Sequence, residues 1–395
     1  MSLVASAQRG PRSRYQLAVR LVRLLTAVVV AASLWATPAA GAAGRVPVGF
    51  YGVMYDGELS SAPIALQKAE FARMARSGVE SVRVVFPWAA AQPAPGPVDF
   101  SLTDQLVALA AAHRLRVLPV VIYAPRWAAL NNNPGVSPPR NPADYAAYLR
   151  ALVRRYGPRG SFWAANRRLQ RVPIREWEVW NEPNIRSYWN VRSGPHGPVL
   201  GYAALLRASY RAIKRADRHA KVVLAGFPLD LPRDLAVLYR RAHIRRYFDV
   251  AGLHPFLKTP ELSLRVVELV RRVMRRFHDA RKPIEITELT WPASKGQSLA
   301  NVLVGWGPLE TTDAGMARRL SDAYRLFVRN RRRLLIRSVY WYDWASSYQP
   351  SSDFDFAGLV RYRDGVVEPQ PALAAYRGSA RHYEGCVKSD WGTCR

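Results

Sequence analysis

Cysteine is almost absent from this sequence of 395 residues: it occurs only as Cys386 and Cys394, with seven residues between them near the C-terminus. Cysteines of exported chains meet an oxidising environment and usually form disulfides. If this chain is exported, we therefore expect Cys386 and Cys394 to pair. The bridge would pin a short tail over residues 386–395. We do not expect it to act as a catalytic pair.

Long apolar runs are absent after residue 44, so no later segment is predicted to span a membrane. Residues 1–44 contain five arginines, then an apolar run of 12 residues from Leu24 to Trp35, then small residues ending at Ala42. This is the pattern of a secretory signal peptide, which we predict to cover residues 1–42 and to be cleaved. An uncleaved membrane anchor is the less favoured alternative, because a spanning helix needs about 20 apolar residues.

Lysine is also scarce, supplying seven of 58 basic residues, and only 29 acidic residues oppose them, which leaves a net charge of +29. Such a charge favours a polyanionic partner. The arginines are spread along the chain, however, and no nucleic-acid-binding motif accompanies them. We therefore favour a compositional explanation and predict no nucleic-acid partner, while electrostatic association with anionic envelope polymers stays an alternative.

Short β-branched or aromatic runs alternate with longer helical patterns along the chain, whose 49% apolar content excludes disorder. No glycine-rich phosphate turn follows the first run, which disfavours a doubly wound sheet. The alternation therefore predicts an α/β fold, a (β/α)8 TIM barrel, in one domain over residues 43–385. The eight predicted strands are Gly49–Met54, Ser81–Phe86, Arg116–Tyr123, Glu176–Trp180, Val222–Gly226, Val250–His254, Ile284–Thr287 and Ser338–Tyr342.

Two glutamates stand at the ends of predicted strands. Glu182 follows the fourth strand in the run Trp180-Asn181-Glu182-Pro183-Asn184, and Glu288 ends the seventh. The C-terminal ends of barrel strands meet at one mouth, where active sites lie. A lone carboxylate there is as readily a solvated or salt-bridged residue. Two facing carboxylates are what glycoside hydrolysis requires, one to cycle a proton and one to attack or to activate water.

From Gly49 to Tyr376 the chain resembles the retaining (β/α)8 glycoside hydrolases of clan A, most closely family 39 and then family 5. The order of the motifs matches throughout. The segments that carry the resemblance are Val82-Arg83-Val84, Ala124-Pro125-Arg126-Trp127-Ala128, Asn181-Glu182-Pro183, Asp249 with His254-Pro255, Thr287-Glu288 and Trp341-Tyr342-Asp343-Trp344.

The resemblance implies a role for each polar residue. It makes Glu182 the acid/base, Glu288 the nucleophile and Asn181 the donor to the 2-hydroxyl of the sugar. Arg83 would hydrogen-bond to Glu288 and keep it ionised, as a rigid, permanently charged fork can do. His254 would line the site, although a purely structural histidine is an equal alternative.

The resemblance also makes Trp344 the floor under the reacting sugar, and we expect Trp127 and Trp189 to face sugar. The sequence departs from the family pattern at Phe256, which replaces a tyrosine whose hydroxyl contacts the nucleophile; Tyr340 or Tyr342 could substitute for it. Two further departures concern substrate subsites and lie at Gln92 and Thr290.

We therefore predict a secreted retaining glycosidase that cleaves O-glycosidic bonds of an extracellular poly- or oligosaccharide and needs no cofactor or metal ion. A transglycosylase using the same residues is one alternative, and a non-catalytic carbohydrate-binding barrel or an envelope-anchored polyanion binder is another. The intact pair of glutamates argues against both binders. The sequence leaves open the sugar, the linkage, endo or exo action and the oligomeric state.

Overall fold

A computed structural model describes residues 46–384 except 132, 134, 135, 192–196, 229, 298–308, 350 and 351. The predicted signal peptide and the cysteines Cys386 and Cys394 lie outside the described residues. Within the described part of the chain, no helix is long and apolar enough to cross a membrane.

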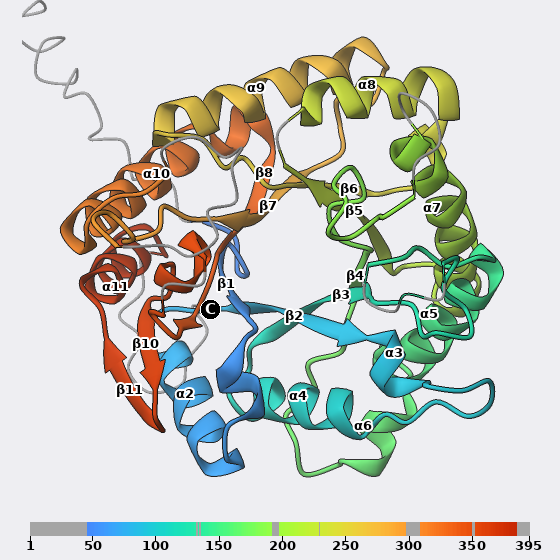
Figure 1. The fold of residues 1–395 in the computed structure, drawn as a ribbon, viewed down its shortest axis with the longest axis horizontal. Helices are drawn as coiled ribbons and strands as arrows, with labels where there is room; N and C mark the ends of the chain where they lie inside the picture. The colour runs from blue at the N-terminus through green and yellow to red at the C-terminus, as the bar shows by residue number, and fades with distance from the viewer. Residues whose placement is uncertain are drawn as a thin grey trace, which may run out of the picture. The chain divides into compact units, whose positions relative to one another are not determined.

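Eight parallel strands close into a barrel in chain order, which confirms the predicted (β/α)8 fold (Figure 1). The first strand pairs with the last, with Tyr51 opposite Val339. Each predicted strand overlaps an observed one. The strands are β1 Tyr51–Tyr55, β2 Ser81–Pro87, β3 Arg116–Ile122, β4 Glu176–Val179, β5 Lys221–Phe227, β6 Val250–Leu253, β7 Ile284–Leu289 and β8 Ile336–Trp341.

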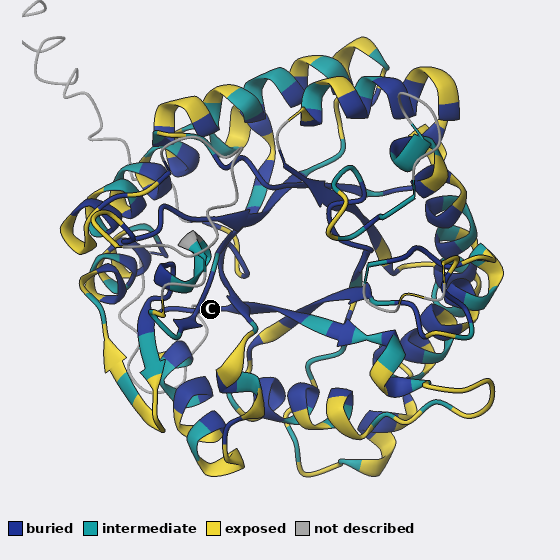
Figure 2. Ribbon diagram, viewed as in Figure 1, coloured by how far each residue is buried: buried dark blue, intermediate teal, exposed yellow. Residues whose placement is uncertain are grey.

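Helices surround the barrel and turn their buried faces toward it, as Figure 2 shows. In α9, for example, the side chains of Val267, Val270 and Met274 share one buried face, the spacing expected of an amphipathic helix. The helices are α2 Ile64–Arg76, α3 Trp88–Ala91, α4 Ser101–Ala112, α5 Pro142–Tyr156, α6 Ser161–Ala165, α7 Gly197–Ala216, α8 Leu231–Ala242, α9 Pro260–Arg276, α10 Asp313–Leu334 and α11 Pro371–Glu384.

Polar caps fix where several helices begin. Asn141 accepts a hydrogen bond from the N–H of Ala143 at the start of α5, Thr259 caps α9 and Thr312 caps α10. Such caps satisfy N–H groups that the first helical turn leaves unpaired.

A three-stranded sheet and the last helix complete the described fold beyond β8. The sheet is formed by β9 Ala345–Ser346, β10 Val360–Arg363 and β11 Val366–Pro369. Helix α11 then packs beside α10, where the ring of Tyr376 meets Tyr324 and Tyr51 edge-on. The C-terminal segment therefore covers the junction where β1 meets β8.

The two ends of the barrel differ in what lies there. Strand C-termini and helix N-termini meet at the end that carries Glu182 and Glu288, which we name the site end. Helix C-termini and strand N-termini meet at the opposite end, which we name the base.

Three single-turn helices complete the described elements: η1 Glu58–Ser61, η2 Ile244–Arg246 and η3 Asp353–Phe356.

Candidate active site

Glu182 and Glu288 come together at the site end of the barrel. Glu182 lies three residues after the end of β4, and Glu288 lies within β7. One carboxylate oxygen of each and one ring nitrogen of His254 all lie within 4.8 Å of one another. Both carboxylates are buried, with residue exposures of 5% and 7%.

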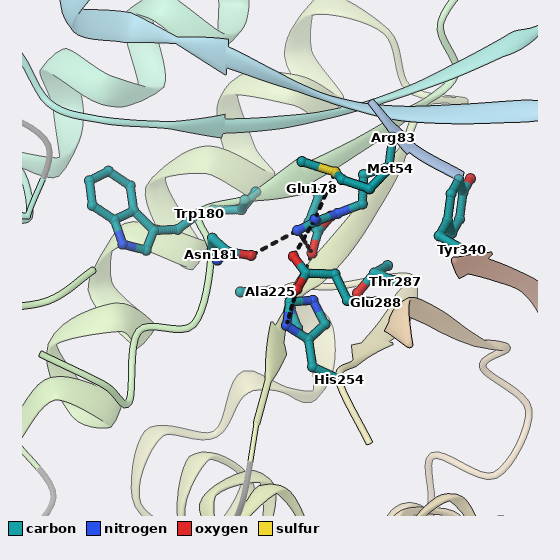
Figure 3. A network of polar contacts seen from close by, with 12 residues as sticks. Met54, Arg83, Glu178, Trp180, Asn181, Ala225, His254, Thr287, Glu288 and Tyr340 are labelled. Carbon is teal, nitrogen blue, oxygen red and sulfur yellow. Dashed lines mark hydrogen bonds and ion pairs between the residues drawn. The ribbon is translucent and has the colours of Figure 1, made fainter. Parts of the chain in front are cut away.

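Arg83 on β2 organises the floor of this cluster (Figure 3). Its Nη1 donates to Glu288 Oε1 at 2.6 Å, and its Nη2 donates to Asn181 Oδ1 at 2.8 Å. Its Nε and Nη2 also donate to the two oxygens of Glu178, at 2.6 and 3.2 Å. The guanidinium of Arg83 is fully buried and contacts both Glu288 and Glu178. Its positive charge is therefore shared by two carboxylates, whereas the sequence predicted a contact with Glu288 alone.

Gly226 on β5 ties three parts of the site together. Its N–H donates to Glu178 Oε1 at 3.1 Å, and its carbonyl accepts from the N–H of Glu182 at 3.1 Å. These groups are available because the pairing of β5 with β6 is irregular between Leu224 and Phe227. The glycine also lacks the Cβ that would meet the ring of His254.

The backbone that presents Glu182 is held in an unfavourable conformation. Trp180 has φ of 69° and Glu182 has φ of 40°, the left-handed region that costs a non-glycine residue about 1–3 kcal/mol. The N–H of Trp180 donates to Val121 O at 3.1 Å, while that of Glu182 is held by Gly226. Surrounding strands therefore impose this conformation, which aims the side chain inward.

His254 bridges the two carboxylates. Its Nδ1 lies 2.7 Å from Glu182 Oε1 and 3.5 Å from Glu288 Oε2. Burial lowers the pKa of His254 well below its ordinary value, and the charge of Arg83 adds to this effect, so the ring is neutral. Nε2 has no hydrogen-bond partner among the described residues. A proton on Nδ1 avoids burying an unpaired N–H, so the ring donates toward the carboxylates.

The two glutamates differ in how they hold a proton. Burial raises the pKa of Glu182 well above its ordinary value, and the charge of Glu288 raises it further. Burial also raises the pKa of Glu288, to about 7, although the adjacent Arg83 lowers it. The depression of the Glu288 pKa expected from Arg83 is therefore outweighed by burial, and the charge of Glu178 raises this pKa further. Arg83 contacts only Glu288 of the pair, so the proton resides on Glu182.

Glu182, His254 and Glu288 also offer the donor types that bind divalent cations. Within the described residues, some of their ligand atoms are already in use: Nδ1 of His254 contacts Glu182, and Oε1 of Glu288 accepts from Arg83. A cation here would lie beside a guanidinium, whose charge opposes it. The geometry fits proton transfer better than metal binding.

The aromatic residues expected to face sugar behave differently from one another. Trp344 is fully buried and its Nε1–H donates to Glu70 of α2, so it packs between the barrel and a helix and does not form a sugar floor. Trp189 is 5% exposed and packs edge-on against Trp180. Trp127 alone of the three is half-buried, with its Nε1–H donating to Gln92 O.

The tyrosine missing at Phe256 is not replaced by Tyr340. The Tyr340 hydroxyl lies 2.8 Å from Ser81 Oγ, near the start of β2 and therefore at the base. Tyr342 follows β8 at the site end, where its pKa is raised by burial, by Asp343 and by nearby charges that include Glu288. Phe256 itself packs edge-on against His254, so the histidine supplies the polar contact to Glu288.

The other two departures from the family pattern are Gln92 and Thr290. Gln92 accepts from Trp88 Nε1 at 2.8 Å and donates to Gly96 O at 2.7 Å, so it braces the loop after α3. Thr290 is buried directly after β7.

Two residues of the site, Glu178 and Gly226, were not predicted from the sequence. The alternation of side chains in β4 could have revealed Glu178, because it points to the barrel interior two residues after Glu176.

Comparison with solved structures returns glycoside hydrolases with the same fold. A family 39 glycoside hydrolase from Bacteroides cellulosilyticus WH2 superposes with a TM-score of 0.63 at 19% identity, covering 85% of this chain and 64% of that one. A monomeric beta-xylosidase from Caulobacter crescentus CB15 gives 0.57 at 17% identity, covering 85% and 69%. A GH5_18 protein from Streptomyces cattleya, in complex with GlcNAc, gives 0.56 at 17%, covering 86% and 81%.

These similarities confirm the predicted resemblance to families 39 and 5 at the level of the fold. No protein-family model matches the sequence, and no curated protein matches it. The chain spans under two thirds of the length of the Bacteroides protein. The chemistry of this chain therefore has to be argued from its own site.

Proposed function

We propose that this protein is a retaining glycoside hydrolase that cleaves O-glycosidic bonds of a poly- or oligosaccharide. The observation that carries the proposal is the arrangement of Glu182 and Glu288, two buried carboxylates of which only Glu288 is bonded to Arg83. The pair thus has one protonated and one ionisable member, the division of labour that glycoside cleavage needs.

In the first step, Glu288 attacks the anomeric carbon of the bound sugar. Its Oε1 is held by Arg83, so Oε2 is the attacking oxygen. The bond from the anomeric carbon to the leaving oxygen breaks while the bond to Oε2 forms, and the proton of Glu182 passes to the leaving oxygen. Glu182 ends this step as a carboxylate, stabilised by the Nδ1–H of His254 at 2.7 Å.

In the second step, the Glu182 carboxylate takes a proton from water. The resulting hydroxide attacks the anomeric carbon, the bond to Glu288 Oε2 breaks, and both glutamates return to their starting states. Two inversions give net retention of the anomeric configuration.

The short separation of the carboxylates supports retention. Inverting enzymes keep their two carboxyl groups about 6.5–9.5 Å apart to leave room for water, whereas retaining enzymes keep them about 5–5.5 Å apart. One oxygen of Glu182 and one of Glu288 lie within 4.8 Å of each other, below the separation that inverting enzymes keep.

Asn181 and Trp127 are the proposed substrate-binding residues. Arg83 occupies Oδ1 of Asn181, which fixes the amide with its NH2 group as the donor available to a sugar hydroxyl. The half-exposed ring of Trp127 offers an apolar face suited to a pyranose. The neighbours include a beta-xylosidase and an exo-beta-1,4-mannosidase, so the fold is compatible with several sugars.

We place the activity outside the cell. The pattern of residues 1–42 supports export, with an arginine-rich start, an apolar run and a small-residue cleavage site. The protein would then meet its saccharide in the extracellular space.

The experiment that tests the mechanism compares Glu288→Gln and Glu182→Gln on aryl glycosides. Glu288→Gln should abolish turnover on every substrate, because no covalent intermediate forms. Glu182→Gln should release an initial burst of the good leaving group and then hydrolyse the intermediate slowly. Glu261→Gln, at an exposed position in α9, is the control and should keep wild-type activity. Wild-type turnover in both site variants would show that the assignment is wrong.

A further inference from the structure

Charge is divided unevenly between the two ends of the barrel. In the described segments that join a barrel helix to the next strand, at the base, eleven basic residues stand against four acidic ones. In the segments that join a strand to the next helix, at the site end, acidic residues outnumber basic ones. Within these connecting segments, the basic residues that look evenly spread in the sequence are therefore concentrated at the base.

Helix dipoles explain only part of this basic face. Arginines in the last turns of α2, α5, α8 and α9 compensate the negative helix ends, an ordinary stabilising effect. Arg159, Arg175 and Arg218 lie outside any helix, in the connections before β4 and β5. Arg159 and Arg218 follow the ends of α5 and α7 by three and two residues, so helix ends account for part of their charge, whereas Arg175 lies ten residues after the end of α6.

A hollow of about 590 Å³ opens among these arginines. Arg154, Arg159, Arg175 and Arg218 line it, and all four are exposed. Within the described part of the chain, none of them has a carboxylate within 4.0 Å. The one acidic residue in the lining, Asp217, accepts a hydrogen bond from the N–H of His219 in its own turn.

A second hollow, of about 320 Å³, adjoins the first because Arg175 lines both. It adds Arg171, which is exposed, and Arg116. Arg337 at its inner side is neutralised by Glu176 and Glu285. The unneutralised arginines therefore form a track from Arg218 to Arg171 across the base.

We propose that this track binds a linear polymer whose repeating units carry phosphate or carboxylate groups. Arginine forks match the geometry of both oxyanions, and successive arginines in adjoining hollows suit repeated charges along one chain. A bilayer surface fits less well: of the large apolar residues exposed in the described chain, only Val48 and Leu335 lie at the base. A polymer held here leaves the site end free, so binding is separate from catalysis.

The test uses the purified protein and measures binding to inorganic polyphosphate and to polygalacturonate by fluorescence anisotropy. The quadruple variant Arg154→Gln, Arg159→Gln, Arg175→Gln and Arg218→Gln should bind about tenfold or more weakly, the effect of losing several charge-assisted contacts. The matched control removes the same charge at the site end through Arg126→Gln, Arg186→Gln, Arg233→Gln and Arg363→Gln, and should lose less than about twofold.

Four results bear on the proposal. Turnover of a small aryl glycoside by the base variant should equal that of the wild type, and the polymer that binds more tightly identifies the anionic group. Equal losses in the two quadruple variants would show that net charge alone is responsible and would overturn the proposal. Tighter, arginine-dependent binding to phosphatidylglycerol vesicles would overturn it in favour of a membrane surface.

Discussion

The ring of His254 lies directly against the α-carbon of Gly226, so closely that a methyl group on the glycine would be 2.0 Å from Nε2. The ring is buried and bonded to Glu182 on its other side, so it has no room to retreat without losing that contact. A residue with no side chain thus sets the position of the group that bridges both carboxylates.

Gly226→Ala should therefore displace His254 and lower kcat by about 100-fold, the cost of misplacing a catalytic group by about 1 Å. Gly378→Ala is the matched control, because its new methyl group meets no atom within 4 Å. The control should keep full activity and gain about 0.5–1 kcal/mol in stability, since alanine favours a helix interior. Steady-state kinetics and thermal unfolding measure both effects, and an unchanged kcat in Gly226→Ala would contradict the role of the glycine.

The rate should depend on pH as a bell-shaped curve. Glu288 must be ionised to attack, so kcat/KM should rise as the pH increases through its pKa of about 7. Glu182 must be protonated to donate, so kcat/KM should fall again at higher pH, where this carboxyl ionises. A pH series with one aryl glycoside tests both limbs, and an acidic limb near the ordinary glutamate pKa would contradict the burial argument.

Glu178→Gln should move the acidic limb to lower pH. The charge of Glu178 raises the pKa of Glu288, and its removal leaves Arg83 paired with Glu288 alone. The Oε1 of glutamine can still accept from Gly226 and from Arg83 Nη2, while its NH2 group replaces the oxygen that accepts from Arg83 Nε, so that one bond is lost. Glu261→Gln should leave the profile in place, whereas an unmoved limb in Glu178→Gln would mean that Arg83 is not shared.

Glu182→Gln should stabilise the protein at alkaline pH while removing the acid. The folded-state pKa of Glu182 lies above its unfolded value of 4.5, so the wild type loses stability as the pH rises above that value. Glutamine carries no such cost. Thermal unfolding should show a higher Tm for the variant at pH 8 and no difference at pH 4, and the opposite order would contradict the burial of a titrating group.

Two tryptophans should separate binding from stability. Trp344→Phe breaks the hydrogen bond to buried Glu70, which should cost about 1–3 kcal/mol of stability and leave KM unchanged. Trp127→Ala removes the hydrogen bond to Gln92 O and the edge contact with Trp88, so it should also cost stability, but in addition it should raise KM by about tenfold. A raised KM in Trp344→Phe would restore this residue as a sugar platform.

The strands were predictable because each is a short run whose residue types differ from those of the helices around it. Glu182 and Glu288 were predictable for a related reason: a strand end fixes the barrel end at which a residue lies, whatever the loops do. Glu176–Val179 matches the prediction to within one residue at its C-terminal end.

Side-chain directions were harder to predict, because they depend on packing between segments far apart in the chain. Trp344 turns toward Glu70 on α2, a residue 274 positions earlier. Gly226 matters through the irregular pairing of β5 with β6, which leaves no mark in the sequence. The sharing of Arg83 between two carboxylates similarly needs the closed barrel.

Closure of the barrel also determines when, during folding, the charge cluster of the site can form. Arg83, Glu178 and Glu288 come from β2, β4 and β7, and the ring of strands is complete only when Tyr51 meets Val339. Contacts so distant in sequence form slowly and late. We therefore expect a shorter product of translation or proteolysis that lacks β8 to lose the charge cluster, because β8 joins β7, which carries Glu288, to β1.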